Sequence, residues 1–193
     1  MKKILVCTSV VMALSACSSL NMGNNSGLAS ASQPTWRDAE NNEFIPSNQK
    51  AANALISAAN AATSGIPLDK SRPLIVATLA NINALEESSP FGRIVAEQVS
   101  GQFTRSGYKM VEMKFRDKVF IKQNVGELLL TREIKEVAQN HQAQAVIVGT
   151  YAESDKLVFV NLKLIRPGDN IVLATYDYAV PLDKTVKSLL GRR

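Results

Sequence analysis

Two short apolar runs constrain the fold of this chain most. Leu74–Ala80 and Ala145–Tyr151 are almost free of polar side chains, and Pro73 introduces the first of them. A run this short and this continuous is typical of a β-strand buried on both faces, as in a sheet covered by helices. The sequence therefore predicts that the first run is a central strand, and the second run repeats its pattern.

An alanine-rich segment is predicted to form the first helix of the domain, from Ser47 to about Ser64. Ser47 is the expected N-cap, and Gly65 stands at the stop position. Small side chains allow close approach, so this face packs either on its own sheet or against a neighbouring subunit. We favour the first, because most amphipathic helices serve their own core.

Two further helices are predicted between the apolar runs. The first is capped by Ser88 or Ser89 and ends at Gly107, and the second covers about 131–140. A strand over 108–115 is predicted to follow the first of them. Strand, helix and strand in this order predict a right-handed crossover unit.

The end of the chain has the alternating pattern of exposed strands. Segments 157–165 and 171–180 carry apolar residues at every second position, and the turn residues 167–170 separate them. These segments predict an antiparallel meander. The fold class expected from the whole order is α+β, a mixed sheet of about five strands with helices packed on it.

The first residues have the pattern of an export signal. Lys2 and Lys3 precede the apolar stretch Ile4–Leu14, which is too short to span a bilayer. Leu14-Ser15-Ala16-Cys17 then matches the lipobox of bacterial lipoproteins. We predict a signal peptide over 1–16, cleaved between Ala16 and Cys17. The alternative is an ordinary secretory signal followed by a chance cysteine.

Lipid chemistry explains the cysteine at the cleavage point. The thiol of Cys17 would take a diacylglycerol, and the freed amine would take a further acyl chain such as palmitate. Two or more chains give stable anchoring, whereas one gives marginal binding. Ser18 resembles the residue that lets proteobacterial lipoproteins pass to the outer membrane, so we expect a lipid anchor there with the domain facing the periplasm. Cys7 leaves with the signal, so no disulfide is expected.

A polar segment over 17–46 separates the lipid from the domain. Its Ser, Asn and Gly content predicts a flexible tether with a reach of about 30 Å. Trp36 and Phe44 interrupt it, and they pack either on the start of the domain or on a partner. The domain is expected over 47–182.

The last segment, 183–193, forms a basic tail. Its four basic residues accompany apolar residues at helical spacing. It is either an amphipathic end that touches an anionic surface or a partner, or a frayed terminal turn.

The sequence offers little for catalysis. His141 is its one histidine, which leaves no His pair for a metal, and no glycine-rich phosphate loop is present. Glu86 and Glu87 are the best carboxylate pair, but adjacent loop residues rarely converge on one reacting atom. The net charge of +5 includes Lys2 and Lys3 and is too small to favour nucleic acid. We expect no enzyme activity, no metal and no cofactor beyond the covalent lipid on Cys17.

Four blocks in this order resemble one known family. They are Leu74–Ala80, Leu85–Arg93, Gly126–Glu133 and Ala143–Tyr151. Together they resemble the FlgO family, lipoproteins of the flagellar outer membrane. The resemblance covers about Pro73 to Leu182. It implies a structural, motility-supporting protein that assembles or stabilises the flagellum where it crosses the outer membrane, as a homo-oligomer beside other flagellar outer-membrane or basal-body proteins.

Charged residues in these blocks are candidates for an interface with a subunit or partner. The candidates are Glu86, Glu87, Arg93, Glu127, Arg132 and Glu133. Each is equally explained as a local salt bridge or a helix-end charge. The competing function is a periplasmic regulatory binding module that reaches across on its tether and acts on a cell-wall synthase.

Overall fold

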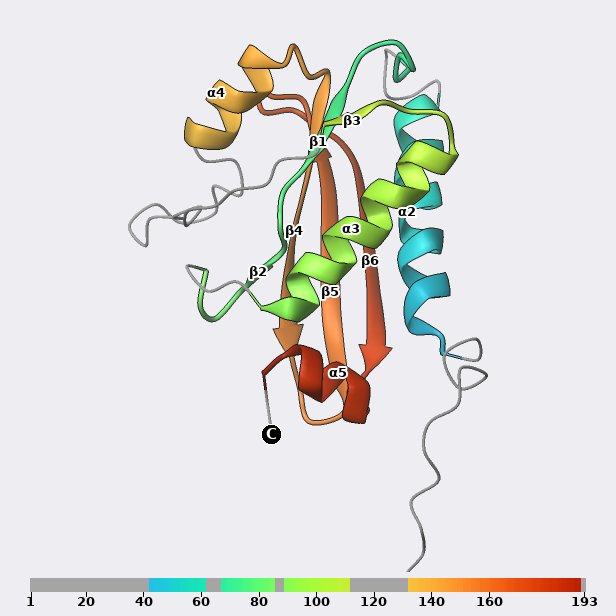
Figure 1. Cartoon of the computed structure of the whole chain (residues 1–193), viewed down its shortest axis with the longest axis vertical. Helices are drawn as coiled ribbons and strands as arrows, with labels where there is room; N and C mark the ends of the chain where they lie inside the picture. The colour runs from blue at the N-terminus through green and yellow to red at the C-terminus, as the bar shows by residue number, and fades with distance from the viewer. Residues whose placement is uncertain (1–41, 62–66, 86–88, 112–131, 192–193) are drawn as a thin grey trace, which may run out of the picture. The chain divides into compact units, whose positions relative to one another are not determined.

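A computed structural model of the protein describes residues 42–61, 67–85, 89–111 and 132–191 (Figure 1). The predicted signal peptide, lipidation site and tether up to residue 41 lie outside these ranges. Gly65 and the second half of the predicted strand over 108–115, residues 112–115, also lie outside them.

A mixed sheet organises the described residues. Six strands pair in the order β3-β1-β4-β5-β6, with β2 beside β4. Their bounds are β1 Leu74–Val76, β2 Ala80–Asn81, β3 Met110–Val111, β4 Ala145–Glu153, β5 Leu157–Ile165 and β6 Val172–Pro181. Strand β1 pairs in parallel with β3 and β4, whereas β4, β5 and β6 form antiparallel pairs. This confirms the predicted α+β class and its closing meander.

The first apolar run is not one continuous strand. Strand β1 is central, and Leu74 and Ile75 are completely buried. The chain then leaves the strand ladder and returns as β2, where Ala80 is the partner of Thr150. Between the two strands, the Leu79 amide donates to the Gly92 carbonyl at 3.3 Å. The prediction of one strand over 74–80 is wrong, because the Leu79 amide bonds to the helix that contains Gly92 and not to a neighbouring strand.

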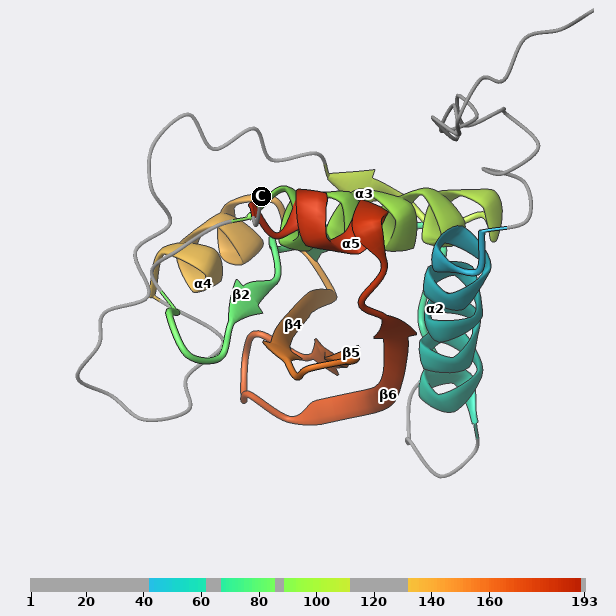
Figure 2. The same ribbon diagram turned by 90° about the horizontal axis from the view of Figure 1, so that it is seen from below.

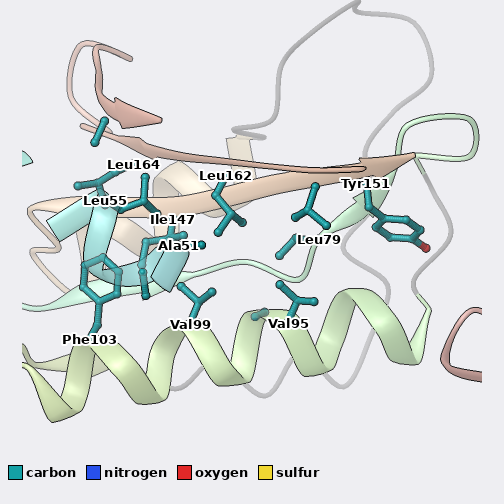
Figure 3. Packing of buried hydrophobic residues seen from close by; sticks show 14 of the residues in the cluster. Ala51, Leu55, Leu79, Val95, Val99, Phe103, Ile147, Tyr151, Leu162 and Leu164 are labelled. Atoms are coloured by element: carbon teal, nitrogen blue, oxygen red, sulfur yellow. The ribbon is translucent and has the colours of Figure 1, made fainter. Parts of the chain in front are cut away.

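Helices lie on both faces of the sheet. On one face are α2 Phe44–Asn60, α3 Pro90–Arg105 and α5 Lys184–Leu189, and on the other is α4 Arg132–Asn140 (Figure 2). The larger core lies under the first group, and Figure 3 shows side chains of α2 and α3 meeting those of the sheet. The residues labelled there are Ala51, Leu55, Leu79, Val95, Val99, Phe103, Ile147, Tyr151, Leu162 and Leu164. The smaller core joins α4 to β1 and β4 through Ile134, Ala138, Ile75 and Val146.

The alanine face of α2 packs on its own domain. Ala51, Ala52 and Leu55 are completely buried, and the helix contacts β6 and α3. This confirms the favoured alternative for the alanine-rich segment. The small side chains let the helix lie close to the sheet.

The start of α2 differs from the prediction. The helix begins at Phe44, and the Phe44 amide donates to the Asn42 side chain at 2.8 Å, so Ser47 is not the N-cap. Pro46 is tolerated because a first-turn amide has no acceptor within the helix. The Phe44 ring lies 5.6 Å from the Phe91 ring and is buried, so Phe44 packs on the domain.

Both ends of α3 agree with the sequence. The Ser89 hydroxyl accepts from the Gly92 amide at 3.1 Å, which identifies Ser89 as the N-cap. At the other end, Gly107 has a φ of 87°, a left-handed conformation that favours glycine. The Tyr108 amide then donates to the Phe103 carbonyl at 3.1 Å and closes the helix.

The basic end of the chain is also packed. Asp183 caps α5 by accepting from the Val186 amide at 2.8 Å, and Val186 is buried in the larger core. The prediction of a frayed terminal turn is therefore wrong for 184–189. Lys184 and Lys187 are exposed on this helix.

Candidate functional site

Two of the blocks that carry the family resemblance meet in the core. The Tyr151 hydroxyl donates to the Ser89 hydroxyl at 2.7 Å, and the rings of Phe91 and Tyr151 lie 5.0 Å apart. Phe91 is completely buried and Tyr151 almost so. These residues hold the start of α3 against β4, so they serve packing and not an exposed site.

Two glycines in the same blocks let a neighbouring backbone segment approach them closely. A Cβ on Gly92 would lie 2.2 Å from the Leu79 carbonyl oxygen. A Cβ on Gly149 would lie 2.7 Å from the Asn161 carbonyl oxygen. Neither neighbour is a flexible side chain, so glycine is the residue that both positions accept.

The charged interface candidates do not form one described surface. Arg93 is exposed on α3, and Arg132 and Glu133 begin α4 on the opposite face of the sheet. Glu86, Glu87 and Glu127 lie outside the described residues, as do Ala16 and Cys17. An interface role for these charged residues stays a prediction.

A different surface stands out in the structure, and we name it the open face. On the α4 side of β4, β5 and β6, the described helices cover only one end, at Val146, Val148 and Ile165. The remaining side chains on this side form the open face: Thr150, Ala152, Leu157, Phe159, Asn161, Lys163, Thr175, Asp177, Ala179 and Pro181. They alternate along the strands with side chains of the larger core.

The open face contains an apolar hollow of about 420 Å³. Its lining residues are Ile82, Thr150, Tyr151, Ala152, Phe159, Val160, Asn161, Asp177, Tyr178 and Ala179. Phe159 is 52% exposed and Ile82, in the turn after β2, is 55% exposed. Contiguous exposed apolar residues of this kind mark contact surfaces more often than scattered ones do.

Two charged side chains stand near the middle of the open face. Lys163 is on β5, and Asp177 is on β6 beside Asn161, whose amide donates to the Asp177 carboxylate at 2.5 Å. Within the described residues, no ion pair joins Lys163 to Asp177. Both charges are therefore available to a surface that packs on this face.

A buried polar network lies on the covered side of the sheet. Asn48 is completely buried, donates to Gln98 at 2.6 Å and accepts a hydrogen bond from the Tyr178 hydroxyl. Burial raises the pKa of Tyr178 well above its usual value, and the neighbouring Tyr176 adds to this effect. The network ties α2 to α3 and β6, which is a structural role.

The described part of the chain contains neither a group of side chains suited to bind a metal ion nor a helix suited to span a membrane. No three His, Cys, Asp or Glu side chains there are grouped as metal ligands. No described helix is both long and apolar enough to cross a membrane.

Solved structures with a similar chain path share little sequence with this protein. The LpoB C-terminal domain from Salmonella enterica is 15% identical with a TM-score of 0.43, covering 66% of this chain and 96% of its own. A PelC variant dodecamer from Paraburkholderia phytofirmans is 13% identical with a TM-score of 0.42, covering 66% and 86%. Lipoprotein GNA1162 from Neisseria meningitidis is 13% identical with a TM-score of 0.42, covering 58% and 82%.

Comparison of the sequence with known proteins and protein families identifies the family of this chain. No curated protein matches the chain. Residues 49–185 match the family described as FlgO protein, which is most of the domain and includes the four blocks identified above. The chain therefore belongs to the FlgO family.

Proposed function

We propose that this protein is a non-enzymatic lipoprotein, anchored in the outer membrane through lipid on Cys17, that assembles or stabilises the flagellar basal body there and supports motility. The observation that carries the proposal is the family match over 49–185, and the predicted lipobox Leu14-Ser15-Ala16-Cys17 supports it. Its partners would be other flagellar outer-membrane or basal-body proteins and further copies of itself.

The structure supports a binding role for the domain. The residues of the family blocks Ser89–Gly92 and Gly149–Tyr151 are used in packing. We take the rest of the described surface as the part available to partners, and the apolar hollow on the open face is one candidate contact surface. A hollow lined mainly by apolar side chains suits protein contact better than acid–base chemistry, which needs convergent polar groups.

The experiment that tests this proposal is fluorescence imaging of a C-terminal fusion in the native host, with swimming measured in a deletion strain and in Cys17→Ala. We expect foci at the flagellar base, and loss of swimming in both strains. Cys7→Ala is the matched control, because Cys7 lies in the predicted signal peptide and carries no lipid. It should swim normally.

Three outcomes would contradict the proposal or a part of it. Normal swimming and normal flagella in the deletion strain would remove the flagellar role. Even peripheral labelling with unimpaired swimming and altered cell wall would instead favour the periplasmic regulatory module that acts on a cell-wall synthase. Normal swimming of the Cys17→Ala strain, with swimming lost in the deletion strain, would contradict only the proposed need for a lipid anchor.

A further inference from the structure

We infer that four basic side chains at one corner of the domain bind the cell-wall polymer through the free carboxylates of its peptide stems. We name these residues the cationic corner: Lys70, Arg72, Arg105 and Lys109. The inference rests on the proposed function, because a domain that faces the periplasm from the outer membrane lies against this polymer.

The cationic corner is built from two segments that are far apart in sequence. The Leu74 amide donates to the Lys109 carbonyl at 2.8 Å, which sets the chain before β1 beside the chain before β3. The Lys70 ammonium nitrogen lies 5.4 Å from the centre of the Tyr108 ring. Arg105 is in the last turn of α3, three residues before Tyr108. The four basic residues therefore meet at one end of α3.

The charge of the cationic corner is not neutralised locally. Residues 69–72 and 105–109 hold four basic side chains and one carboxylate, Asp69, which gives a net charge of +3. Hydrogen bonds from Ser71 lower the pKa of Asp69, and the neighbouring basic side chains lower it further. Within the described ranges, none of the four basic side chains forms an ion pair, and all four residues are exposed. They are therefore available to an anionic ligand.

One side chain holds the turn that carries two of the four charges. The Gln144 side-chain amide donates to the Asp69 carbonyl at 2.5 Å and to the Arg72 carbonyl at 2.7 Å. The Gln144 side-chain oxygen accepts from the Asp69 amide at 2.8 Å. These hydrogen bonds fix the backbone of the turn, so binding costs only the freedom of the Lys70 and Arg72 side chains.

The composition of the cationic corner suits a charged polymer better than a protein. The centre of a protein interface is formed by aromatic and apolar side chains. None of the exposed large apolar side chains that the structure describes belongs to 69–72 or 105–109. Exposed ion pairs are individually weak, but a polymer that repeats its carboxylates can form several of them at once. The peptide stems of the bacterial cell wall form such a polymer.

The cationic corner lies far from the point where the chain enters the domain. Asn60, the last residue of α2, donates to the Tyr108 hydroxyl at 2.8 Å, so this end of the helix lies at the corner. The 17 residues of α2 span roughly 25 Å at the rise of an α-helix, which separates Phe44 from the corner (Figure 1). A domain held by the predicted tether at Phe44 can therefore extend the corner away from the membrane and toward the cell wall.

The experiment measures binding of the full-length lipidated protein, kept in detergent, to isolated cell-wall sacculi, which sediment on centrifugation. The wild type should sediment with the sacculi at low salt. Binding should fall at least about tenfold when NaCl is raised from roughly 0.05 M to 0.5 M, because salt screens exposed charges. Arg72→Gln combined with Lys109→Gln should weaken binding about tenfold at low salt, the effect of losing roughly 1.4 kcal/mol.

Two control variants separate a specific contact from net charge. Lys184→Gln combined with Lys187→Gln removes the same charge from exposed positions on α5, at the opposite end of the domain in Figure 1. Arg72→Lys combined with Lys109→Arg keeps the charge of the corner. Both variants should bind as the wild type does, and thermal melting shows whether each variant is folded.

Three results would overturn the inference. Wild-type protein that does not bind sacculi, or binds them equally at high salt, would exclude a charge contact with the cell wall. Equal losses in the two glutamine pairs would show that net charge, and not the corner, controls binding. Loss of foci at the flagellar base in the Arg72→Gln, Lys109→Gln strain, with sacculus binding unchanged, would assign the corner to an acidic protein partner.

These results are distinguishable from those that test the proposed function. Absence of sacculus binding, with foci at the flagellar base and swimming lost in the deletion strain, removes this inference alone. Salt-sensitive sacculus binding through the corner, with a deletion strain that swims normally, removes the flagellar role alone.

Discussion

The two faces of the β4–β5–β6 meander differ in what covers them. On one face, Leu162 and Leu164 lie completely buried beneath α2 and α3. On the other face, Phe159 stays half exposed, although its chain neighbours Val158 and Val160 are buried. The first face makes the domain stable, and the second can change at little cost to folding. Substitutions of similar chemistry on the two faces should therefore separate stability from partner contact.

The largest effect is expected from Phe91→Ala. Its ring is completely buried and touches the rings of Phe44 and Tyr151. Removing a buried Phe side chain lowers the free energy of unfolding by about 3–5 kcal/mol through lost burial and a residual cavity. Denaturant unfolding followed by circular dichroism measures it. A loss below about 1 kcal/mol would mean that the covered face is far looser than its packing indicates.

Gly92→Ala should have the next largest effect. Its Cβ would lie 2.2 Å from a backbone oxygen, so α3 must move away from Leu79. Overpacking of this kind costs about 3 kcal/mol. Gly168→Ala is the matched control, because its Cβ would meet no atom within 4 Å, and it should leave the unfolding midpoint almost unchanged.

Tyr178→Phe should have an intermediate effect. It removes the hydroxyl that donates to the buried Asn48 side chain, which costs about 1–3 kcal/mol. Because burial raises the folded-state pKa of Tyr178, the wild type should lose stability as pH rises above the unfolded-state value of about 10. The free energy of unfolding of Tyr178→Phe should fall less steeply in that range. Identical slopes in the two proteins would exclude Tyr178 as a source of the alkaline loss.

The smallest effect on stability is expected from Phe159→Ala. Its side chain is 52% exposed on the open face, so the free energy of unfolding should fall by less than about 1 kcal/mol. Denaturant unfolding followed by circular dichroism measures this loss. A loss of about 3 kcal/mol or more, as expected for Phe91→Ala, would show that Phe159 is packed as tightly as the residues of the covered face.

The sequence predicted the parts of the fold that depend on local chemistry. Ser89 and Gly107 mark both ends of α3 through a side-chain cap and a left-handed turn, which are local requirements. The buried face of β5 also follows from alternation, since Val158, Val160, Leu162 and Leu164 are all buried as expected.

The differences from the prediction depend on specific contacts that the hydrophobic pattern does not reveal. The break between β1 and β2 depends on a hydrogen bond from Leu79 to Gly92. The early start of α2 depends on Asn42 and on Phe44 packing against Phe91. The open face was not predicted because alternation identifies the buried face of β5 but does not show whether another element covers the opposite face. Phe159 is apolar on the exposed side, and a single sequence gives no sign of that.

The pairing of α2 with β6 has a consequence for how the chain folds. Asn48 and Tyr178 are 130 residues apart, and they join the first described helix to the last strand. Strands β4, β5 and β6 are close in sequence and can pair early, whereas contacts of such long range form late because they close a long loop first. A chain that emerges with its N-terminus first cannot complete its larger core until nearly all of it is available. Until then, the apolar face of α2 stays exposed, and this interval is when the protein is most open to aggregation.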